Sequence, residues 1–342
     1  MKFVMPVLLT LLAVAPARAQ SAWTQQVAWT QRDEPRVVDI EAVVTDSEGN
    51  RVSGLAAGDF RLLVDGTEVP VGRFTEVAEG TMGRSYLLFI DDSLSLAVQR
   101  DLVLWEIERD LDRLGPGDRM AIVAFDGSRL HPLADWTGDR AVLAAAFAEA
   151  RRRPGNGIPA LAEGRSARFA IVAGDAAAKA LRGFSLPPGR KAMLVLSGGW
   201  PAGPSLELIR DANRLGYTLY PVDVPGLDLA RAFTTSDGEQ ASHDTLLALA
   251  QATGGQPAIN SARLAALEQA EEDTRSYYWL GFSPSWKADD RNHRIELEVR
   301  RPGLAVRARH SFSDLSPETL AGMETEDLLL FGLEAGDQET GD

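Results

Sequence analysis

The chain has 342 residues, and its content of 45% hydrophobic and 25% charged residues is typical of a globular protein. Its formal net charge is −14, which disfavours nucleic acid and anionic lipid as partners because both attract basic surfaces. It contains no cysteine, so disulfide bonds and the modified cysteine of a bacterial lipoprotein are excluded. A cationic partner or a divalent metal fits this charge better.

The first residues have the pattern of a secretory signal peptide. Lys2 provides a basic start, residues 3–15 are almost wholly apolar, and Ala17-Arg18-Ala19 matches a cleavage site with small residues. We therefore predict a signal peptide over 1–19, export to the periplasm or the cell exterior, and a linker over 20–35. No later segment approaches about eighteen consecutive apolar residues, so we expect no membrane insertion.

Residues 36–80 have the pattern of antiparallel β-strands. Apolar and polar side chains alternate from Val37 to Thr45, and two further extended runs, Phe60–Val64 and Thr67–Val77, are separated by Asp65-Gly66. Asp-Gly between two extended runs is a strong signal for a hairpin. Three or four strands bury too little apolar surface to be stable alone, so this unit needs partner strands.

Residues 84–275 alternate strand and helix patterns, which predicts a doubly wound α/β domain with a mainly parallel sheet. Continuous apolar runs predict strands buried on both faces at 85–90, 119–125, 192–196 and 218–222. A short antiparallel edge strand is expected at 130–133. Apolar residues at helical spacing predict helices at 96–114, 137–153 (capped by Thr137), 165–181, 205–215, 244–252 and 262–275.

Strand patterns return after the α/β domain, in residues 276–312. Three extended runs lie there: Tyr277–Phe282, Arg294–Arg300 and Leu304–His310. These runs are the partners that residues 36–80 lack, so we predict one β-sandwich built from both ends of the chain, with the α/β domain inserted between its halves. Residues 313–342 form an acidic tail in which 324–333 is compatible with a helix.

Oxygen-bearing side chains follow the first strand of the α/β domain. Asp91, Ser93 and Ser95 form the pattern D-x-S-x-S on the loop that leads into the next helix. Open α/β sheets place ligand sites at the carboxyl ends of their strands, and one carboxylate with two hydroxyls can converge there on a hard cation such as Mg²⁺. The alternative is that Asp91 or Ser93 only caps the following helix.

The D-x-S-x-S loop resembles the metal-ion-dependent adhesion site of von Willebrand factor A domains. The order of segments along the chain resembles a bacterial secreted family related to these domains and first noticed in acidobacteria. The resemblance implies an α/β fold of this class and a role in adhesion or protein binding. It rests on eight stretches: Val43–Asp46 with Gly49, Gly58–Phe60 with Asp65-Gly66, Asp91–Ser95, Asp135–Asp139, Pro188–Lys191, Leu219–Asp223, Ala252–Gly255 and Tyr277–Gly281.

The same resemblance implies two further metal ligands that this sequence lacks. Gly198 stands where the family has an aspartate after a later core strand, and Pro154–Glu163 lacks the threonine expected on a middle loop. Hard cations bind mainly through carboxylate charge, so one carboxylate with two hydroxyls is a weak ligand set. We therefore expect a degenerate site at Asp91, Ser93 and Ser95 that binds Mg²⁺ weakly or not at all. No other cofactor is indicated.

Tryptophans and histidines are further candidates for contact or ligand residues. Trp200 lies in a Gly- and Pro-rich loop beside the degenerate site, and with Asp92 it is predicted to be an exposed contact for a partner. Four other tryptophans are expected in the core or at domain contacts: Trp105, Trp136, Trp279 and Trp286. The histidines have no ligand spacing and are expected at surface or packing positions: His131, His243, His293 and His310.

The sequence contains no nucleophile elbow, P-loop or H-E-x-x-H motif. We therefore predict a non-enzymatic function, that of an exported von Willebrand factor A-like module that binds an unidentified protein partner or mediates adhesion. The alternative is a structural or scaffold protein of the cell envelope whose metal site has decayed. Dependence of partner binding on divalent cations would distinguish the two.

Overall fold

The computed structural model describes most of the chain from Arg36 onward: residues 36–156, 166–185, 187, 189–198, 200, 202–224, 236–259 and 265–334. The predicted signal peptide, the linker, most of the loop expected to carry a threonine, and the end of the acidic tail lie outside the described residues. None of the described helices combines the length and the hydropathy needed to cross a membrane.

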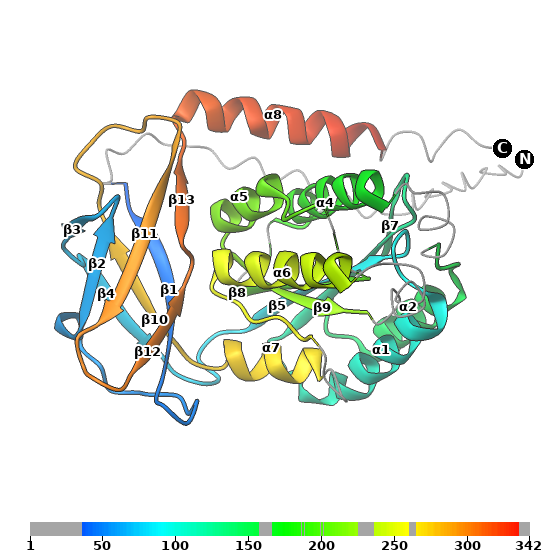
Figure 1. Ribbon diagram of the computed structural model, residues 1–342, viewed down its shortest axis with the longest axis horizontal. Helices are drawn as coiled ribbons and strands as arrows, with labels where there is room; N and C mark the ends of the chain where they lie inside the picture. The colour runs from blue at the N-terminus through cyan, green and yellow to red at the C-terminus, as the bar shows by residue number, and fades with distance from the viewer. Residues whose placement is uncertain are drawn as a thin grey trace, which may run out of the picture. The chain divides into compact units, whose positions relative to one another are not determined.

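A five-stranded sheet forms the centre of the α/β domain (Figure 1). Its order is β7 (Leu130–Thr137), β6 (Arg119–Phe125), β5 (Arg84–Asp91), β8 (Arg190–Ser197) and β9 (Tyr217–Asp223). β6, β5, β8 and β9 run parallel, whereas β7 pairs antiparallel with β6 at the edge. The predicted mainly parallel sheet and its antiparallel edge strand are confirmed.

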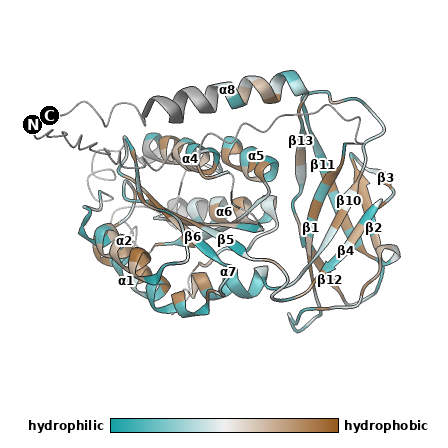
Figure 2. Ribbon diagram, turned by 180° about the vertical axis from the view of Figure 1, so that it is seen from behind, coloured by the Kyte–Doolittle hydropathy of each residue, from teal (hydrophilic) through white to brown (hydrophobic). Residues whose placement is uncertain are grey.

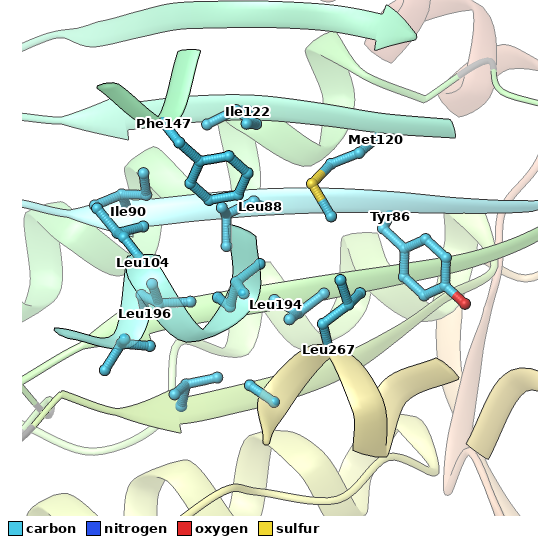
Figure 3. Packing of buried hydrophobic residues seen from close by; sticks show 14 of the residues in the cluster. Tyr86, Leu88, Ile90, Leu104, Met120, Ile122, Phe147, Leu194, Leu196 and Leu267 are labelled. Atoms are coloured by element: carbon cyan, nitrogen blue, oxygen red, sulfur yellow. The ribbon is translucent and has the colours of Figure 1, made fainter. Parts of the chain in front are cut away.

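Helices cover both faces of this sheet. The first face carries α1 (Ala97–Arg109), followed by the 3-10 helix η3 (Asp110–Arg113), α2 (Arg140–Arg152) and α7 (Ala266–Thr274). Figure 3 shows Leu104 of α1, Phe147 of α2 and Leu267 of α7 packed over the strands. The second face carries α4 (Ser166–Gly183), α5 (Leu206–Leu215) and α6 (Ser236–Thr253). The prediction of a doubly wound α/β fold is confirmed.

The β-sandwich consists of two four-stranded sheets. One has the order β12 (Ala305–Ala308), β1 (Val38–Thr45), β10 (Tyr277–Phe282) and β4 (Arg73–Val77). The other has the order β13 (Ser311–Asp314), β11 (Arg291–Val299), β2 (Phe60–Val64) and β3 (Thr67–Val69). In each sheet, a strand that precedes the α/β domain pairs with one that follows it, β1 with β10 and β2 with β11. Both ends of the chain therefore build one sandwich, as predicted.

The Asp65-Gly66 turn joins β2 to β3 as a two-residue hairpin. Val64 and Thr67 are paired across the turn, and φ is +48° at Asp65 and +77° at Gly66. A type I′ turn requires positive φ at both central positions, which glycine adopts without a Cβ clash. The hairpin predicted from the sequence is confirmed. A short 3-10 helix, η2 (Ala57–Asp59), precedes β2.

Several predicted boundaries are wrong. β7 extends to Thr137, beyond the predicted end at residue 133, because its later residues also pair with β6. Its edge position tolerates Pro132, which cannot donate to a sheet hydrogen bond. The carboxylate of Asp139, not the hydroxyl of Thr137, caps α2, and it accepts from the N–H of Ala141 at 2.8 Å. α6 begins at residue 236, earlier than expected. Helix α8 (Pro317–Glu334) begins at a proline, which is favoured at the first helical position.

His293 joins the two halves of the sandwich through carboxylates. Its Nδ1 lies 2.7 Å from the carboxylate of Asp65, and its Nε2 lies 3.1 Å from that of Asp289. The ring stacks on Phe312 with centroids 5.1 Å apart. Burial alone would lower the pKa of His293, but the hydrogen bonds to Asp65 and Asp289 outweigh it, so the pKa is raised. The side chain is therefore packed between two carboxylates that favour its protonated form, in keeping with the packing position expected for it.

His293→Gln should lower the free energy of unfolding by about 1 kcal/mol at pH 5.5 and by less at pH 9. A raised pKa in the folded state stabilises the fold below the pKa of the unfolded chain, about 6.5, and this stabilisation is lost as pH rises through the folded value. Urea denaturation of both proteins at the two pH values measures the difference. An effect of the same size at both pH values would show that the imidazolium charge does not matter.

Candidate functional site

The D-x-S-x-S residues lie where β5 passes into α1. Asp91 is the last residue of β5, the middle strand of the sheet, and Ser93 and Ser95 lie on the following loop. Ser197 and Gly198 lie at the end of β8, the strand paired with β5. The side chains of Asp91 and the three serines are fully buried. The loop therefore has the place in the fold that the resemblance to von Willebrand factor A domains implied.

Both carboxylate oxygens of Asp91 accept hydrogen bonds. Oδ1 accepts from the Oγ and N–H of Ser93, at 2.5 and 3.1 Å, and from the N–H of Leu94 at 3.3 Å. Oδ2 accepts from Ser197 Oγ at 2.7 Å and from Trp200 Nε1 at 3.1 Å. Burial raises the pKa of Asp91, and these donors oppose the shift. Five donors thus surround a carboxylate that offers about four lone-pair positions.

Helix capping does not explain the motif. The N-cap of α1 is Leu96, and no side chain forms a capping hydrogen bond there. Asp91 instead accepts from backbone N–H groups at positions 93 and 94, before the helix begins. The alternative that Asp91 or Ser93 caps α1 is therefore wrong, and the motif fixes the loop that precedes the helix.

The residues present do not fit a hard divalent cation in this arrangement. Mg²⁺ requires oxygen lone pairs at about 2.1 Å, whereas the lone pairs of Asp91 already face protein donors. Ser93 directs its hydroxyl to the same carboxylate. The buried Oγ of Ser95 has no hydrogen-bond partner in the part of the chain that the structure describes. Of the three predicted ligands, only Ser95 thus has a hydroxyl free to bind a cation. Gly198 has no side-chain carboxylate to add.

Asp92 points away from Asp91 and forms a buried ion-pair cluster. Its Oδ1 accepts from Arg100 Nη1 at 2.5 Å, and its Oδ2 accepts from Arg153 Nε at 2.8 Å. Burial raises the pKa of Asp92, and the two guanidinium groups oppose the shift. Its backbone oxygen accepts from the N–H of Asn156 at 2.7 Å. Asp92 therefore ties the loop after β5 to the segment that follows α2.

Neither residue predicted to contact a partner is exposed. Trp200 has 0% exposure and packs in the core on the α4–α6 face of the sheet while its indole N–H binds Asp91. Asp92 is also fully buried. The prediction that both lie on an accessible rim is wrong, because a buried carboxylate needs donors and the indole and guanidinium groups supply them. Trp105, expected in the core or at a domain contact, is instead 57% exposed.

Three residues of this site were not identified from the sequence: Arg100, Arg153 and Ser197. Arg100 carried a usable signal, because it lies at helical spacing from Val103, Leu104 and Ile107 on the buried face of α1. An arginine on an apolar face requires a buried acid, and Asp92 is the nearest acid before the helix. Arg153 and Ser197 carried no comparable signal.

A second group of potential ligands lies in the sandwich, where one atom each from Asp289, His293 and Asp314 lie within 4.8 Å of one another. These atoms already have partners. The two oxygens of Asp314 pair with Arg36 and with the indole N–H of Trp286, at 2.9 and 2.8 Å. Both nitrogens of His293 face carboxylates, which favours the imidazolium that cannot bind a metal. The group acts as a structural contact.

No family model matches the chain, and no curated protein does. Among solved structures, the chain is similar to the manganese-loaded TRAP protein of Plasmodium vivax, with 14% identity, coverage of 70% of this chain and 96% of that one, and a TM-score of 0.38. It is similar to the pilus adhesin SpaC of Lactobacillus rhamnosus GG, with 10% identity, coverage of 76% and 48%, and a TM-score of 0.38. The SpRpn10 VWA domain shares 14% identity, with coverage of 45% and 84% and a TM-score of 0.24.

Identities of 10–14% and TM-scores of 0.24–0.38 transfer no function to this chain. The chain's own topology is that of a doubly wound α/β fold. It has a doubly wound, mainly parallel sheet, and its D-x-S-x-S loop leaves the carboxyl end of the central strand. The loop therefore lies where open α/β sheets place ligand sites, although its polar side chains form hydrogen bonds with one another and with Ser197.

Proposed function

We propose that the chain is an exported, non-enzymatic von Willebrand factor A-like module that binds a protein partner without a divalent cation. In this proposal it is a member of the bacterial secreted family that its sequence resembles, with a degenerate adhesion site. Export rests on the signal-peptide pattern of residues 1–19. The partner surface lies on α1, next to the D-x-S-x-S loop, because Asp92 and Trp200 are buried.

An exposed apolar stripe on α1 carries this proposal. Val98, Leu102 and Trp105 are 73%, 58% and 57% exposed, and their spacing of four and three residues places them on one face of the helix. Figure 2 shows hydrophobic residues on α1 together with hydrophilic ones. The guanidinium of Arg151 lies over the Trp105 ring at 3.8 Å from its centroid, which holds the indole in place. Exposed tryptophan on an apolar patch is typical of binding hot spots.

The hydrogen bonds of Asp91 support independence from metal. An adhesion site of the metal-dependent kind uses the cation to reach a ligand, and here protein donors occupy both oxygens of the carboxylate. The hydrogen-bonded D-x-S-x-S loop still has a role in the proposal. It holds the start of α1 in place and thereby positions the exposed apolar stripe of this helix. A small residue is required where the chain after α2 crosses this loop, since a Cβ at Gly155 would lie 2.5 Å from the backbone nitrogen of Ala97.

Trp105→Ser should weaken partner binding at least about 30-fold, because truncation of a hot-spot tryptophan costs about 2 kcal/mol or more. The partner is first captured from the native envelope and culture medium with the wild-type chain, then purified and titrated calorimetrically. Leu206→Ser is the matched control, since Leu206 is 77% exposed but lies on α5, on the opposite face of the sheet. Its dissociation constant should equal that of wild type, with and without EDTA.

Equal dissociation constants for Trp105→Ser and wild type would place the partner surface elsewhere. Loss of binding in EDTA would contradict the proposed independence from metal. A wild-type chain that retains no partner from envelope or medium would favour the alternative, a structural or scaffold protein.

A further inference from the structure

A cavity of about 510 Å³ lies between the sandwich and the α/β domain. Strands β1, β12 and β13 contribute to one side, and α5 with the beginnings of β8 and β9 contributes to the other. The cavity is thus at the amino ends of the parallel strands, the edge opposite Asp91. Its volume is within the range of small-molecule sites, which often lie between domains.

The lining of this cavity is basic, although the chain carries a net charge of −14. Six basic and three acidic side chains line it. Two of the basic groups, Lys191 and Arg309, form no ion pair with any residue that the structure describes. The other four are paired with carboxylates: Arg36 with Asp314, Arg190 with Glu41, Arg214 with Asp211, and Arg307 with Asp273.

The two groups without a carboxylate partner are held in place by other contacts. Arg309 donates to the backbone oxygens of Asn213 and Asp39, and its Nε has no partner among the described residues. The Nζ of Lys191 lies 5.6 Å from the centroid of the Tyr217 ring. Burial lowers the pKa of Lys191, and it lowers that of Arg309 to about 10. Glu41 attracts both cations and Asp39 attracts Arg309, but neither acid lies within ion-pair distance of them, so a bound anion would add the direct charge partner that both half-buried cations lack.

Further polar atoms of the lining residues are buried without a hydrogen-bond partner among the described residues. They include Arg214 Nη2, Ser313 Oγ and the Oδ1 of Asn213, and the Asn213 residue is 2% exposed. Buried polar atoms without partners are rare in folded proteins and call for a bound group. Here they comprise donors for an anion and an acceptor for a hydroxyl or N–H group.

We propose that the cavity binds a small organic anion that carries a carboxylate or phosphate group, with Lys191 and Arg309 as its charge partners. Arg214 and Ser313 add donors to the anion, and Asn213 accepts from a hydroxyl or N–H group of the same ligand. Apolar side chains such as Leu215 and Trp279 complete the wall. The proposal does not depend on the partner surface of α1.

Calorimetric titration of the full chain with succinate and with inorganic phosphate tests this site, and sodium chloride at equal ionic strength is the control. Saturable binding of either probe is expected, and the probe that binds identifies the carboxylate or phosphate as the recognised group. Lys191→Met should weaken that binding at least about tenfold, because one charge-assisted contact is lost. Lys179→Met, at an exposed position on α4, is the matched control and should bind as wild type does.

Absence of saturable binding of both probes to wild type at up to about 10 mM would overturn the proposal. Equal affinities of wild type and Lys191→Met would also overturn it. Should Lys191→Met fail to fold, Arg214→Gln replaces it, because glutamine retains a hydrogen-bonding group at this largely buried position of α5. Binding to Arg214→Gln must then be weaker than binding to wild type.

Discussion

Asp92→Ala should lower the free energy of unfolding by about 3–5 kcal/mol, because it removes the carboxylate that lies between the buried Arg100 and Arg153. The Asp92 carboxylate is 1% exposed and pairs with Arg100 at 2.5 Å and with Arg153 at 2.8 Å. Arg100 is itself fully buried and cannot turn to water. It keeps hydrogen bonds to Asp101 and to the backbone oxygen of Arg153, which favours the lower end of this range.

Guanidinium denaturation followed by circular dichroism measures this loss. Glu149→Ala is the control, because the Glu149–Arg152 pair is 47% and 67% exposed and should contribute less than about 0.5 kcal/mol. The double variant Asp92→Leu with Arg100→Met should recover much of the loss, since it removes both buried charges and leaves Arg153 near the surface. A loss below about 1 kcal/mol in Asp92→Ala would show that the cluster stores little stability.

Most of the fold could be predicted from the sequence because its strands have two distinct hydrophobic patterns, one continuously apolar and one alternating. The runs at 85–90, 119–125 and 192–196 are continuously apolar, as strands buried on both faces must be. The sandwich strands alternate, and Asp65-Gly66 fixed one hairpin. The start of α2 was less readable, because Thr137 and Asp139 can both act as caps and only the pairing of β7 decides between them.

The site was less predictable than the fold, because its contacts join residues far apart in the chain. The sequence placed Asp91, Ser93 and Ser95 on the correct loop. It does not show that the indole of Trp200 reaches Asp91 across 109 positions, and a Gly- and Pro-rich loop by itself predicts exposure. The same limit applies to Arg153, which reaches Asp92 across 61 positions. Hydrophobic patterns in the sequence indicate which residues are buried. The hydrogen-bond partners of a buried polar side chain depend instead on which loops the fold brings together at the ends of the strands.

Trp200→Ala should lower the free energy of unfolding by about 3–5 kcal/mol, because it leaves a cavity and removes a donor from a buried carboxylate. Trp200 is the largest of the fully buried side chains in the described residues. Trp200→Phe keeps most of the apolar volume and removes the N–H that binds Asp91 Oδ2 at 3.1 Å, so it should cost about 1–3 kcal/mol. The difference between the two variants separates packing from hydrogen bonding. Equal losses would mean that the packed volume contributes nothing beyond the indole N–H, and an unchanged stability in Trp200→Phe would mean that the N–H contributes nothing.

Magnesium provides the sharper test of the same contact. With Asp91 fully engaged by protein donors, a dissociation constant of about 10 mM or weaker is expected, and Mg²⁺ at that concentration stabilises wild type by at most about 0.4 kcal/mol. The corresponding rise in Tm is below about 2 °C. Trp200→Phe frees one lone pair but supplies no second carboxylate, so its Tm should respond equally little. A larger rise in wild type that disappears in Asp91→Asn would show that Asp91 exchanges its donors for the cation, and the adhesion site would then be functional.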